Sequence, residues 1–271
     1  MPELPEVETI ARGLSRAIVG RTVERIAVVR PEVVAPAPRR FSRALRGERI
    51  AGVGRRGKYV VVSLGSGRSL VVHLRMTGRL VVQPPTATAL EPYTTVALEF
   101  AGGGRLCFAD VRRFGRMRLV GPEEPWASGV GLEPLSPDFS GDRFSGLLSG
   151  RTTPIKAFLL DQRRIAGIGN IYACEALWEA RIRPSRPAGA LTGPQRRRLH
   201  RAIDDVLRRA IEMRGSSIDD YVDAEGLRGG FQNALRVYGR EGEPCRRCGR
   251  PIARTVLAQR GTWWCRTCQR I

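Results

Sequence analysis

Apolar residues at helical spacing open this chain. Val7, Ile10, Leu14 and Ile18 recur every three or four residues, which is typical of one buried face of an amphipathic helix. Pro5 suits a first helical turn, and the glutamates around it suit the positive end of a helix dipole. The pattern therefore predicts a helix that begins near Pro5 and ends near Ile18.

Short runs with alternating apolar residues follow, separated by glycine-containing turns. Such runs are typical of half-buried strands. The predicted strands are residues 22–29, 59–64, 70–74, 79–82, 94–100, 105–109 and 117–120. Several short strands behind one leading helix predict a β-sandwich or a barrel-like domain.

The character of the chain changes after a linker rich in proline and glycine, residues 121–141. Helical periodicity then dominates, in residues 142–149, 153–161, 171–180 and 192–213. Residues 214–230 are rich in glycine and aspartate and have weak periodicity, so we expect a long loop there. Long loops inside compact proteins are often functional.

Charge indicates the kind of partner. The 46 Lys and Arg residues against 26 Asp and Glu residues give a net charge of +20. The bases cluster, since residues 235–271 hold nine Arg and two Glu. A surplus of this size favours a polyanionic partner, most simply nucleic acid. No apolar run reaches the length of a membrane span and the amino end has no signal segment, so we expect a soluble, cytoplasmic protein.

Histidine is scarce. With only His73 and His200, the chain has almost no material for a histidine-based triad or a histidine-rich metal centre. His200 lies in a basic helical run, where we expect a surface or half-buried position.

Four cysteines form the strongest single motif. Two residues separate Cys245 from Cys248, 16 separate Cys248 from Cys265, and two separate Cys265 from Cys268. Two such knuckles predict one structural, tetrahedral zinc ion. The alternative is a pair of disulfides, which a cytosolic chain disfavours. Cys107 and Cys174 lie outside the pattern and are expected to be buried apolar residues.

The segment between the knuckles predicts a hairpin, with strands at residues 254–258 and 262–264 and Gln259-Arg260-Gly261 at its tip. A basic tip on a zinc hairpin is suited to a nucleic-acid groove, and Arg260 is its best-placed charge.

Two further motifs have both a functional and a structural interpretation. The turn Gly167-Ile168-Gly169-Asn170 precedes a helix and could hold a phosphate with Asn170 as cap and donor, although most such turns merely join helices. In Asp110-Val111-Arg112-Arg113-Phe114-Gly115, two arginines and an aromatic ring suit insertion into a nucleic-acid stack. Taken singly, Phe114 and Met76 would be core residues and Lys58 a surface residue.

The extreme amino end could be chemically active. We expect Met1 to be removed, because initiator methionine is readily trimmed before a small residue such as Pro2. Trimming leaves a secondary amine with an intrinsic pKa of about 8, so a sizeable fraction is nucleophilic near neutral pH. Glu3 and Glu6 are near enough in sequence to move protons for it. The alternative is an ordinary capped helix start.

Together these motifs resemble bacterial formamidopyrimidine-DNA glycosylases over essentially the whole chain. The resemblance depends on the PELPEVET start, the segments around Lys58 and His73–Gly78, Asp110–Gly115, Gly167–Asn170, Val237-Tyr238-Gly239-Arg240, and the four cysteines. It implies an α+β protein with three parts. These are a two-layer β-sandwich with a leading helix (residues 1–130), a helix–two-turns–helix DNA-binding domain with a lesion-capping loop (131–236), and a zinc β-hairpin (237–271).

The resemblance also implies a base-excision repair activity. A bifunctional glycosylase and abasic-site lyase of this kind removes oxidised purines such as 8-oxoguanine and formamidopyrimidines from double-stranded DNA. Pro2 would form a Schiff base with the sugar, and β- and δ-elimination would follow. Glu3 would be the proton donor and Glu6 a supporting carboxylate. Lys58 and Arg260 would assist with later proton transfer or phosphate contact, although Arg260 suits phosphate better because guanidinium stays protonated.

Further residues would contact DNA by the same resemblance. Met76, Arg112 and Phe114 would fill the gap left by an extruded base. Arg151, Lys156 and Asn170 would contact phosphates, and Ser216 would lie in the lesion-capping loop. Many relatives have His near position 93, where this chain has Tyr93, so that one DNA contact is in doubt.

Two competing functions have their own signatures. An endonuclease VIII type enzyme would act on oxidised pyrimidines, but the PELPEVET start and the long loop after Arg214 favour oxidised purines. A DNA-binding paralogue without activity would not need five residues that are intact here: Pro2, Glu3, Glu6, Lys58 and Arg260. We expect a monomer that works in the bacterial cytoplasm in association with the nucleoid.

Overall fold

The computed structural model describes residues 1–218 and 221–270, and the chain divides into two compact units. The first unit is Met1–Ser128 with Met213–Gln232, and the second is Gly129–Glu212 with Asn233–Ile271. Each unit is described by itself below. The three expected parts and these two units divide the chain differently, because residues 213–232 group with the first unit and the zinc hairpin groups with the helices.

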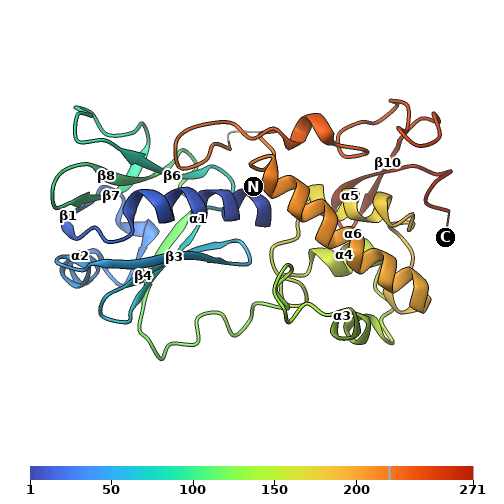
Figure 1. Cartoon of the computed structure of the whole chain (residues 1–271), viewed down its shortest axis with the longest axis horizontal. Coiled ribbons are helices and arrows are strands. Elements are labelled where there is room, and N and C mark those ends of the chain that lie inside the picture. Colours follow the sequence, from blue (N-terminus) through green and yellow to red (C-terminus); the bar gives the residue numbers. More distant parts are fainter. Residues whose placement is uncertain (219–220, 271) are drawn as a thin grey trace. The chain divides into compact units, whose positions relative to one another are not determined.

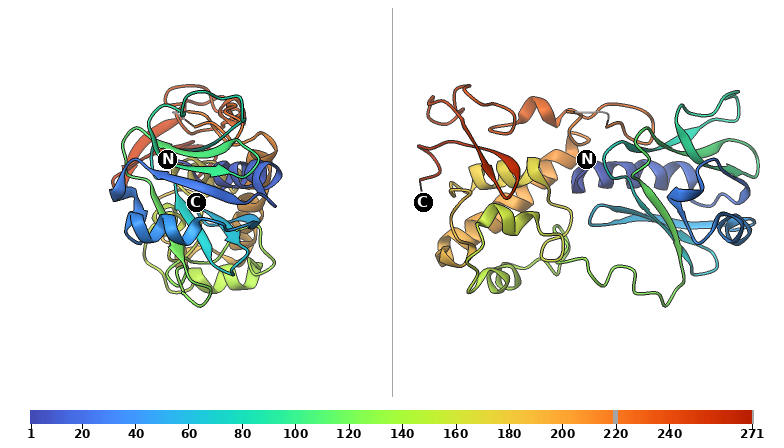
Figure 2. Two further views of the ribbon diagram at one scale, coloured as in Figure 1. Left: turned by 90° about the vertical axis from the view of Figure 1, so that its left-hand side faces the viewer. Right: turned by 180° about the vertical axis from the view of Figure 1, so that it is seen from behind.

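The first unit is a two-layer β-sandwich, as predicted (Figures 1 and 2). One sheet has the order β1 (Val23–Val28), β7 (Thr94–Phe100), β8 (Arg105–Asp110) and β6 (Gly78–Gln83). The other has the order β2 (Val34–Ala35), β9 (Arg116–Val120), β5 (Ser69–His73), β4 (Tyr59–Leu64) and β3 (Ile50–Arg56). Neighbouring strands are antiparallel except β2 and β9, which are parallel.

Two helices cover the edges of the sandwich. Helix α1 (Leu4–Ile18) contacts β3 and β6, which are edge strands of different sheets. In Figure 1 it runs along the sandwich between these two layers. Helix α2 (Pro38–Leu45) contacts β1 and β2, the edge strands on the opposite sides. Covering these edges shields apolar surface and discourages pairing with other chains.

The core of the first unit uses both of its chain segments. Val7, Ile10, Leu14 and Ile18 form the buried face of α1, each at most 1% exposed, as the spacing predicted. They join one apolar cluster with both sheets, α2 and two residues from far along the chain, Tyr221 and Ala224. The Val82 N–H of edge strand β6 also donates to the Ala224 carbonyl at 3.3 Å. Residues 213–232 are therefore a structural part of this unit.

The second unit is built from helices and a hairpin. Its elements are α3 (Gly141–Leu148), α4 (Ile155–Leu160), α5 (Asn170–Glu179), α6 (Gly193–Glu212), β10 (Ala253–Leu257) and β11 (Arg260–Trp264). Short 3₁₀ helices lie at Pro31–Val33, Ala188–Ala190 and Phe231–Ala234 along the whole chain. Helix α5 is central, since it contacts α4, α6 and β11. In the part of the chain described here, no helix is both long and apolar enough to cross a membrane.

Three local features differ from the expectations. Helix α2 was not predicted, because only Phe41 and Leu45 of its eight residues are buried apolar residues and three are arginines. Strand β3 was not predicted because glycines and arginines interrupt its apolar positions. The hairpin turn is Ala258 and Gln259, both with positive φ, so Arg260 begins β11 and is not at the tip. In a two-residue turn, positive φ values at both residues match the twist of the two flanking strands. The strands can therefore pair directly after the turn.

We predict that Leu14→Ala destabilises the first unit by about 2–5 kcal/mol, because it leaves a cavity at a side chain that is 0% exposed. Amide hydrogen exchange, read separately for peptides of each unit, measures the effect. Arg12→Ala on the solvent side of the same helix is the matched control and should change exchange little. Equal exchange in the two variants would contradict the assignment of α1 to the core.

Candidate functional site

Two carboxylates fix the amino end of α1. Glu3 is the N-cap, and its side chain accepts the backbone N–H of Glu6. In return Glu6 Oε2 accepts the Glu3 N–H at 2.8 Å, which completes a capping box. Glu3 and Glu6 are 4% and 2% exposed, and Pro2 is buried as well, whereas Met1 is exposed. The structure thus brings Pro2, Glu3 and Glu6 together at one buried helix terminus.

The second oxygen of Glu6 holds residues 213–232. Glu6 Oε1 accepts the Ser216 N–H at 2.7 Å. Gly215 permits this approach: its φ is +78°, and a Cβ there would lie 2.8 Å from Oε1. The Tyr221 hydroxyl donates to the Glu6 carbonyl at 3.4 Å. Burial and the nearby Glu6 raise the pKa of Tyr221, so the phenol keeps the proton that it donates.

Ser216 itself has an unusual environment. Its residue is 5% exposed, and its hydroxyl oxygen is buried without a hydrogen-bond partner among the described residues. An unsatisfied buried hydroxyl in a native protein needs an explanation, such as a ligand that is bound in use. The Ser216 N–H is thus bonded to Glu6, while its side-chain hydroxyl can still form a hydrogen bond with a ligand.

Lys58 lies in the turn between β3 and β4 and is only 6% exposed, so it is not the surface lysine that an isolated position would predict. The hairpin is tied to α1 by an ion pair, in which Arg55 Nε donates to Glu8 Oε2 at 2.9 Å. Burial opposes ionisation of Glu8, but hydrogen bonds from Arg12 and Arg55 lower its pKa overall. Figure 1 shows the hairpin turn and the amino end of α1 at the same end of this unit.

Two loops of the first unit present exposed side chains, and we call them the insertion loops: residues 74–77 and 111–115. Met76 is 43% exposed on the first, and Phe114 is 50% exposed on the second. The Arg112 guanidinium lies 4.9 Å from the centre of the Phe114 ring. Large apolar side chains are seldom so exposed without a purpose, and here they come from adjacent loops.

Asp110 holds the insertion loops together. This carboxylate is 2% exposed, and it accepts the Thr77 hydroxyl from one loop. From the other loop it accepts the Gly115 N–H at 2.7 Å and the Arg112 N–H at 3.2 Å. Gly115 is required because a Cβ there would lie 2.5 Å from the Phe108 ring. The sequence pattern predicted the loop Asp110–Gly115, but it did not predict that Asp110 holds both insertion loops together.

Tyr93 also lies beside this region. It is 64% exposed with a φ of +64°, and its carbonyl accepts the Asp110 N–H at 3.0 Å. The ring therefore projects from a backbone that is fixed to the start of the second insertion loop. A phenol in this position can offer a hydroxyl to a phosphate, which keeps the contact expected from the relatives chemically feasible.

In the second unit, Gln162 organises the connection between α4 and α5. Its side-chain amide donates to the carbonyls of Leu160 and Ile168 at 3.0 and 2.7 Å, and its oxygen accepts the Gly167 N–H at 2.8 Å. Gly167 has a φ of +82°. The N-cap of α5 is Gly169, and Asn170 is the first helical residue, so the expectation that Asn170 caps the helix was wrong. A glycine at the cap lets the backbone amides approach an anion closely.

Lys156 and Asn170 meet on the zinc hairpin. Lys156 is 0% exposed, and its Nζ donates to the Gly261 carbonyl at 2.9 Å and to the Thr262 hydroxyl at 2.7 Å. Asn170 Nδ2 donates to the same carbonyl at 3.0 Å. Its Oδ1 is buried and has no partner among the described residues. Both side chains thus fix the start of β11, next to Arg260.

Arg260 and Arg151 are exposed. Arg260 pairs with Leu257 across the hairpin, directly after the turn. Arg151 follows α3, and its backbone carbonyl accepts the Gly189 N–H at 2.7 Å. Each guanidinium is carried by a fixed backbone while its charge faces solvent, which suits contact with a polyanion.

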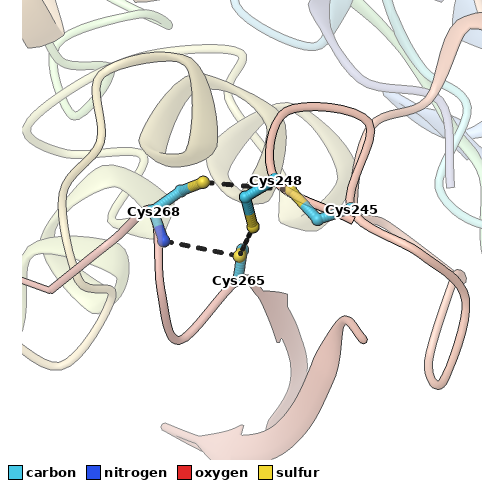
Figure 3. A group of neighbouring side chains, drawn as sticks. All are labelled: Cys245, Cys248, Cys265 and Cys268. Atoms are coloured by element: carbon cyan, nitrogen blue, oxygen red, sulfur yellow. Dashed lines mark hydrogen bonds between the residues drawn. The ribbon is translucent and has the colours of Figure 1, made fainter. Parts of the chain in front are cut away.

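The four cysteines form one cluster (Figure 3). Their sulfur atoms all lie within 4.8 Å of one another, with 3.5 Å between Cys248 and Cys265 and 4.0 Å between Cys245 and Cys268. A tetrahedral zinc ion with Zn–S bonds of about 2.3 Å needs sulfur atoms roughly 3.8 Å apart. The described cysteines form no disulfide, and Cys107 and Cys174 are buried as expected. Cys174 packs in the same apolar cluster as Cys245 and Cys265 but is not one of the four grouped sulfur ligands.

Hydrogen-bond donors beside Cys245 favour its thiolate form. Burial opposes ionisation of Cys245, but the N–H groups of Arg247 and Cys248 and the Trp178 indole lower its pKa to about 6. Thiolates are the form that binds metal. The geometry and chemistry of the four cysteines therefore fit one structural zinc ion with no open coordination position.

Glu175 is a buried structural acceptor that the sequence pattern did not predict. It is fully buried on α5 and accepts the N–H groups of Arg236, Val237 and Tyr238 at 2.8, 2.9 and 2.9 Å. Complete burial raises its pKa, although these three donors oppose the shift. One available signal was a glutamate among the apolar residues of α5. His200 was also placed correctly as half-buried, with Nε2 2.6 Å from the Phe139 carbonyl.

The sandwich, the two-turn helical connection and the zinc hairpin define a zinc-finger DNA-repair glycosylase. Residues 1–117 match the formamidopyrimidine-DNA glycosylase N-terminal domain. Residues 130–222 match the H2TH domain of the same enzymes, and residues 242–271 match the zinc finger found in FPG and IleRS. The chain therefore belongs to the formamidopyrimidine-DNA glycosylase family.

Individual relatives agree over nearly the full length. Formamidopyrimidine-DNA glycosylase of Moorella thermoacetica is 49% identical over 94% of each chain. The structure of MutM (Fpg) from Thermus thermophilus is similar with a TM-score of 0.88 and 43% identity, and covers 99% of this chain and 98% of that one. A Lactococcus lactis Fpg mutant in complex with Fapy-dG DNA gives a TM-score of 0.93 at 38% identity over 100% of both chains. The same L. lactis protein has been solved with abasic DNA and with an oxidised pyrimidine.

We predict that Cys245→Ala releases zinc and weakens binding to undamaged duplex DNA, because three thiolates no longer complete the tetrahedron that holds the hairpin. Metal analysis and fluorescence anisotropy measure the two effects, and hydrogen exchange should show the first unit still folded. Cys107→Ala, in the first unit, is the control and should keep its zinc. Unchanged DNA affinity in a zinc-free Cys245→Ala protein would contradict a DNA-binding role for the hairpin.

Proposed function

We propose that this protein is a bifunctional DNA glycosylase and abasic-site lyase that removes oxidised purines, 8-oxoguanine and formamidopyrimidines, from duplex DNA during base-excision repair. The observation that carries the proposal is the buried cluster of Pro2, Glu3 and Glu6 at the amino end of α1. A repair enzyme of this kind would act on the chromosome in the cytoplasm. Family membership supports the class of reaction, and the cluster supplies a nucleophile and a proton donor for it.

The first steps use Pro2 and Glu3. After Met1 is removed, the Pro2 nitrogen becomes a secondary amine, and the helix terminus beside it disfavours the protonated form. Its lone pair attacks C1′ of the extruded nucleotide, the bond from C1′ to the base breaks, and the base leaves with a proton. Glu3 donates a proton to O4′ as the sugar ring opens, and the nitrogen lone pair forms the C1′ iminium.

Strand cleavage follows from the iminium. It withdraws electrons from C2′, so a C2′ proton is lost and the 3′ phosphate departs in β-elimination. A second proton loss, at C4′, expels the 5′ phosphate in δ-elimination. Hydrolysis of the remaining iminium by water returns the Pro2 amine and releases the sugar fragment as an aldehyde. Glu6 serves this sequence by holding the Glu3 backbone in place.

Two basic residues complete the proposed catalytic set. Lys58 is a buried amine at the tip of the β3–β4 hairpin and can assist proton transfer or hold a phosphate. Arg260 stays protonated at any working pH, so we assign it to a phosphate beside the lesion. Its exposed position at the start of β11 supports this assignment.

The remaining side chains would present one nucleotide to the cluster. Met76 and Phe114 would enter the space left by the extruded base, which compensates for lost stacking, and Arg112 would bond the orphaned partner base. In the second unit, DNA phosphates would be bound by three residues, either directly or by positioning the groups that bind them: Arg151, Lys156 and Asn170. The unsatisfied Ser216 hydroxyl supports a role for it in binding the extruded base.

We predict that borohydride traps a covalent adduct between the processed protein and lesion-containing duplex DNA. Mass spectrometry should place the sugar on the Pro2 nitrogen. Inserting Lys between Met1 and Pro2 retains Met1 and converts that nitrogen to an amide, so the adduct should disappear. Zinc content and affinity for undamaged DNA serve as controls for folding. A full-strength adduct in the inserted chain would falsify the mechanism.

A second candidate substrate class is oxidised pyrimidine, because the L. lactis relative has been solved with DNA containing one. We predict that single-turnover excision of 8-oxoguanine opposite cytosine is faster than excision of thymine glycol. The reason is that the chain belongs to the formamidopyrimidine-DNA glycosylase family. Faster removal of thymine glycol would assign the chain to pyrimidine repair, while leaving the proline mechanism intact.

A further inference from the structure

His73 ends β5 immediately before the first insertion loop, and its ring contacts that loop's backbone. The imidazole Nδ1 accepts the Arg75 N–H at 3.0 Å. Arg75 has a φ of +55°, in the left-handed region that disfavours side chains with a Cβ. Met76, one of the side chains proposed to enter the DNA stack, follows directly. The conformation that presents Met76 thus has a local hydrogen bond to stabilise it.

The hydrogen bond requires a particular form of the imidazole. Nδ1 can accept only when it carries no proton, so the ring is neutral with its proton on Nε2. Burial, together with the charges of Arg75 and Lys58, lowers the pKa of His73 to about 4. The neutral form therefore persists through any physiological pH.

The neighbouring elements agree with this state. On one side Tyr59 of β4 pairs with His73, and its ring packs edge-on at 4.7 Å. On the other side Arg116 of β9 pairs with His73 and donates to the carbonyls of Arg113 and Gly115 in the second insertion loop, at 3.0 and 2.7 Å. The titratable neighbours facing the imidazole are thus cations or a neutral phenol, and none of those described is a carboxylate that would favour imidazolium.

We propose that His73 is a positioning residue for base extrusion, because its unprotonated Nδ1 holds the left-handed turn at Arg75 and so fixes Met76. The inference rests on the proposed function. His73 and Arg116 form a cross-strand pair in which each side chain supports one insertion loop. This positioning role of His73 uses Nδ1, and it is separate from any contact between Nε2 and a ligand.

Two substitutions separate positioning from ligand contact. Asn at position 73 can accept the N–H two residues ahead through its side-chain oxygen, as in an Asx turn, but it lacks Nε2. Leu has neither group. We expect His73→Leu to slow single-turnover excision of 8-oxoguanine about tenfold, the size of one lost buried hydrogen bond. His73→Asn should recover most of that rate.

A double-mutant cycle with Met76→Ala tests whether His73 acts through Met76. In the Met76→Ala background, His73→Leu should slow excision less than about twofold, since the side chain that it positions is absent. Full multiplication of the two effects would overturn the inference, as would a His73→Asn protein no faster than His73→Leu. An unaltered zinc content confirms that the variants fold.

The tautomer can be observed without any DNA reaction. The chain has two histidines, so long-range proton–nitrogen NMR spectra contain two imidazole patterns, and His200 is an internal reference. We expect His73 to carry its proton on Nε2 and to remain neutral down to about pH 5, consistent with its low pKa. A proton on Nδ1, or titration near the ordinary value of about 6.5, would overturn the inference. Absence of all excision with the expected tautomer would instead refute the proposed function.

Discussion

The carboxylate of Glu6 is the contact on which the functional end of the first unit depends. One oxygen accepts the Glu3 N–H and the other accepts the Ser216 N–H, which lies 210 residues along the chain from Glu6, so a single side chain joins two distant backbone segments. Both bonds are buried, where an unpaired carboxylate oxygen or N–H costs far more than at the surface. The place of Pro2 and the conformation of residues 213–232 are therefore set together. A base that contacts this segment would also contact the structure that orients the proposed nucleophile.

The same principle recurs throughout the molecule. Exposed side chains proposed to touch DNA are carried by backbone that buried polar groups hold in place. Asp110 fixes the insertion loops, Gln162 fixes the turn before α5, and Lys156 with Asn170 fixes the start of β11. Such groups stabilise one geometry because their hydrogen bonds have direction, which apolar packing lacks. The geometry of the exposed residues thus depends on polar side chains that are themselves buried or half-buried.

The sequence was informative wherever a function depends on local spacing. The apolar period of α1, most strands and helices, the four cysteines and the capped amino end follow from residues a few positions apart, and the structure confirms them. Hydrogen bonds between polar residues far apart in the sequence could not be predicted from local spacing. Nothing near Glu175 indicates that it accepts three N–H groups 61 to 63 residues away. Lys156 illustrates the same limit, since its burial against Thr262 depends on how α4 and the hairpin pack together.

Tyr221 and Ala224 belong to the core of a unit whose first and longer segment ends at Ser128. This discontinuity governs the order of events during synthesis. A ribosome releases the whole sandwich sequence long before it reaches these two residues, and most of the second unit is made in between. Domains usually fold as they emerge, amino end first. Here the last piece of the first unit's core arrives only after about four-fifths of the chain has been made. A gene fragment that stops at residue 128 would thus encode a sandwich lacking part of its own interior.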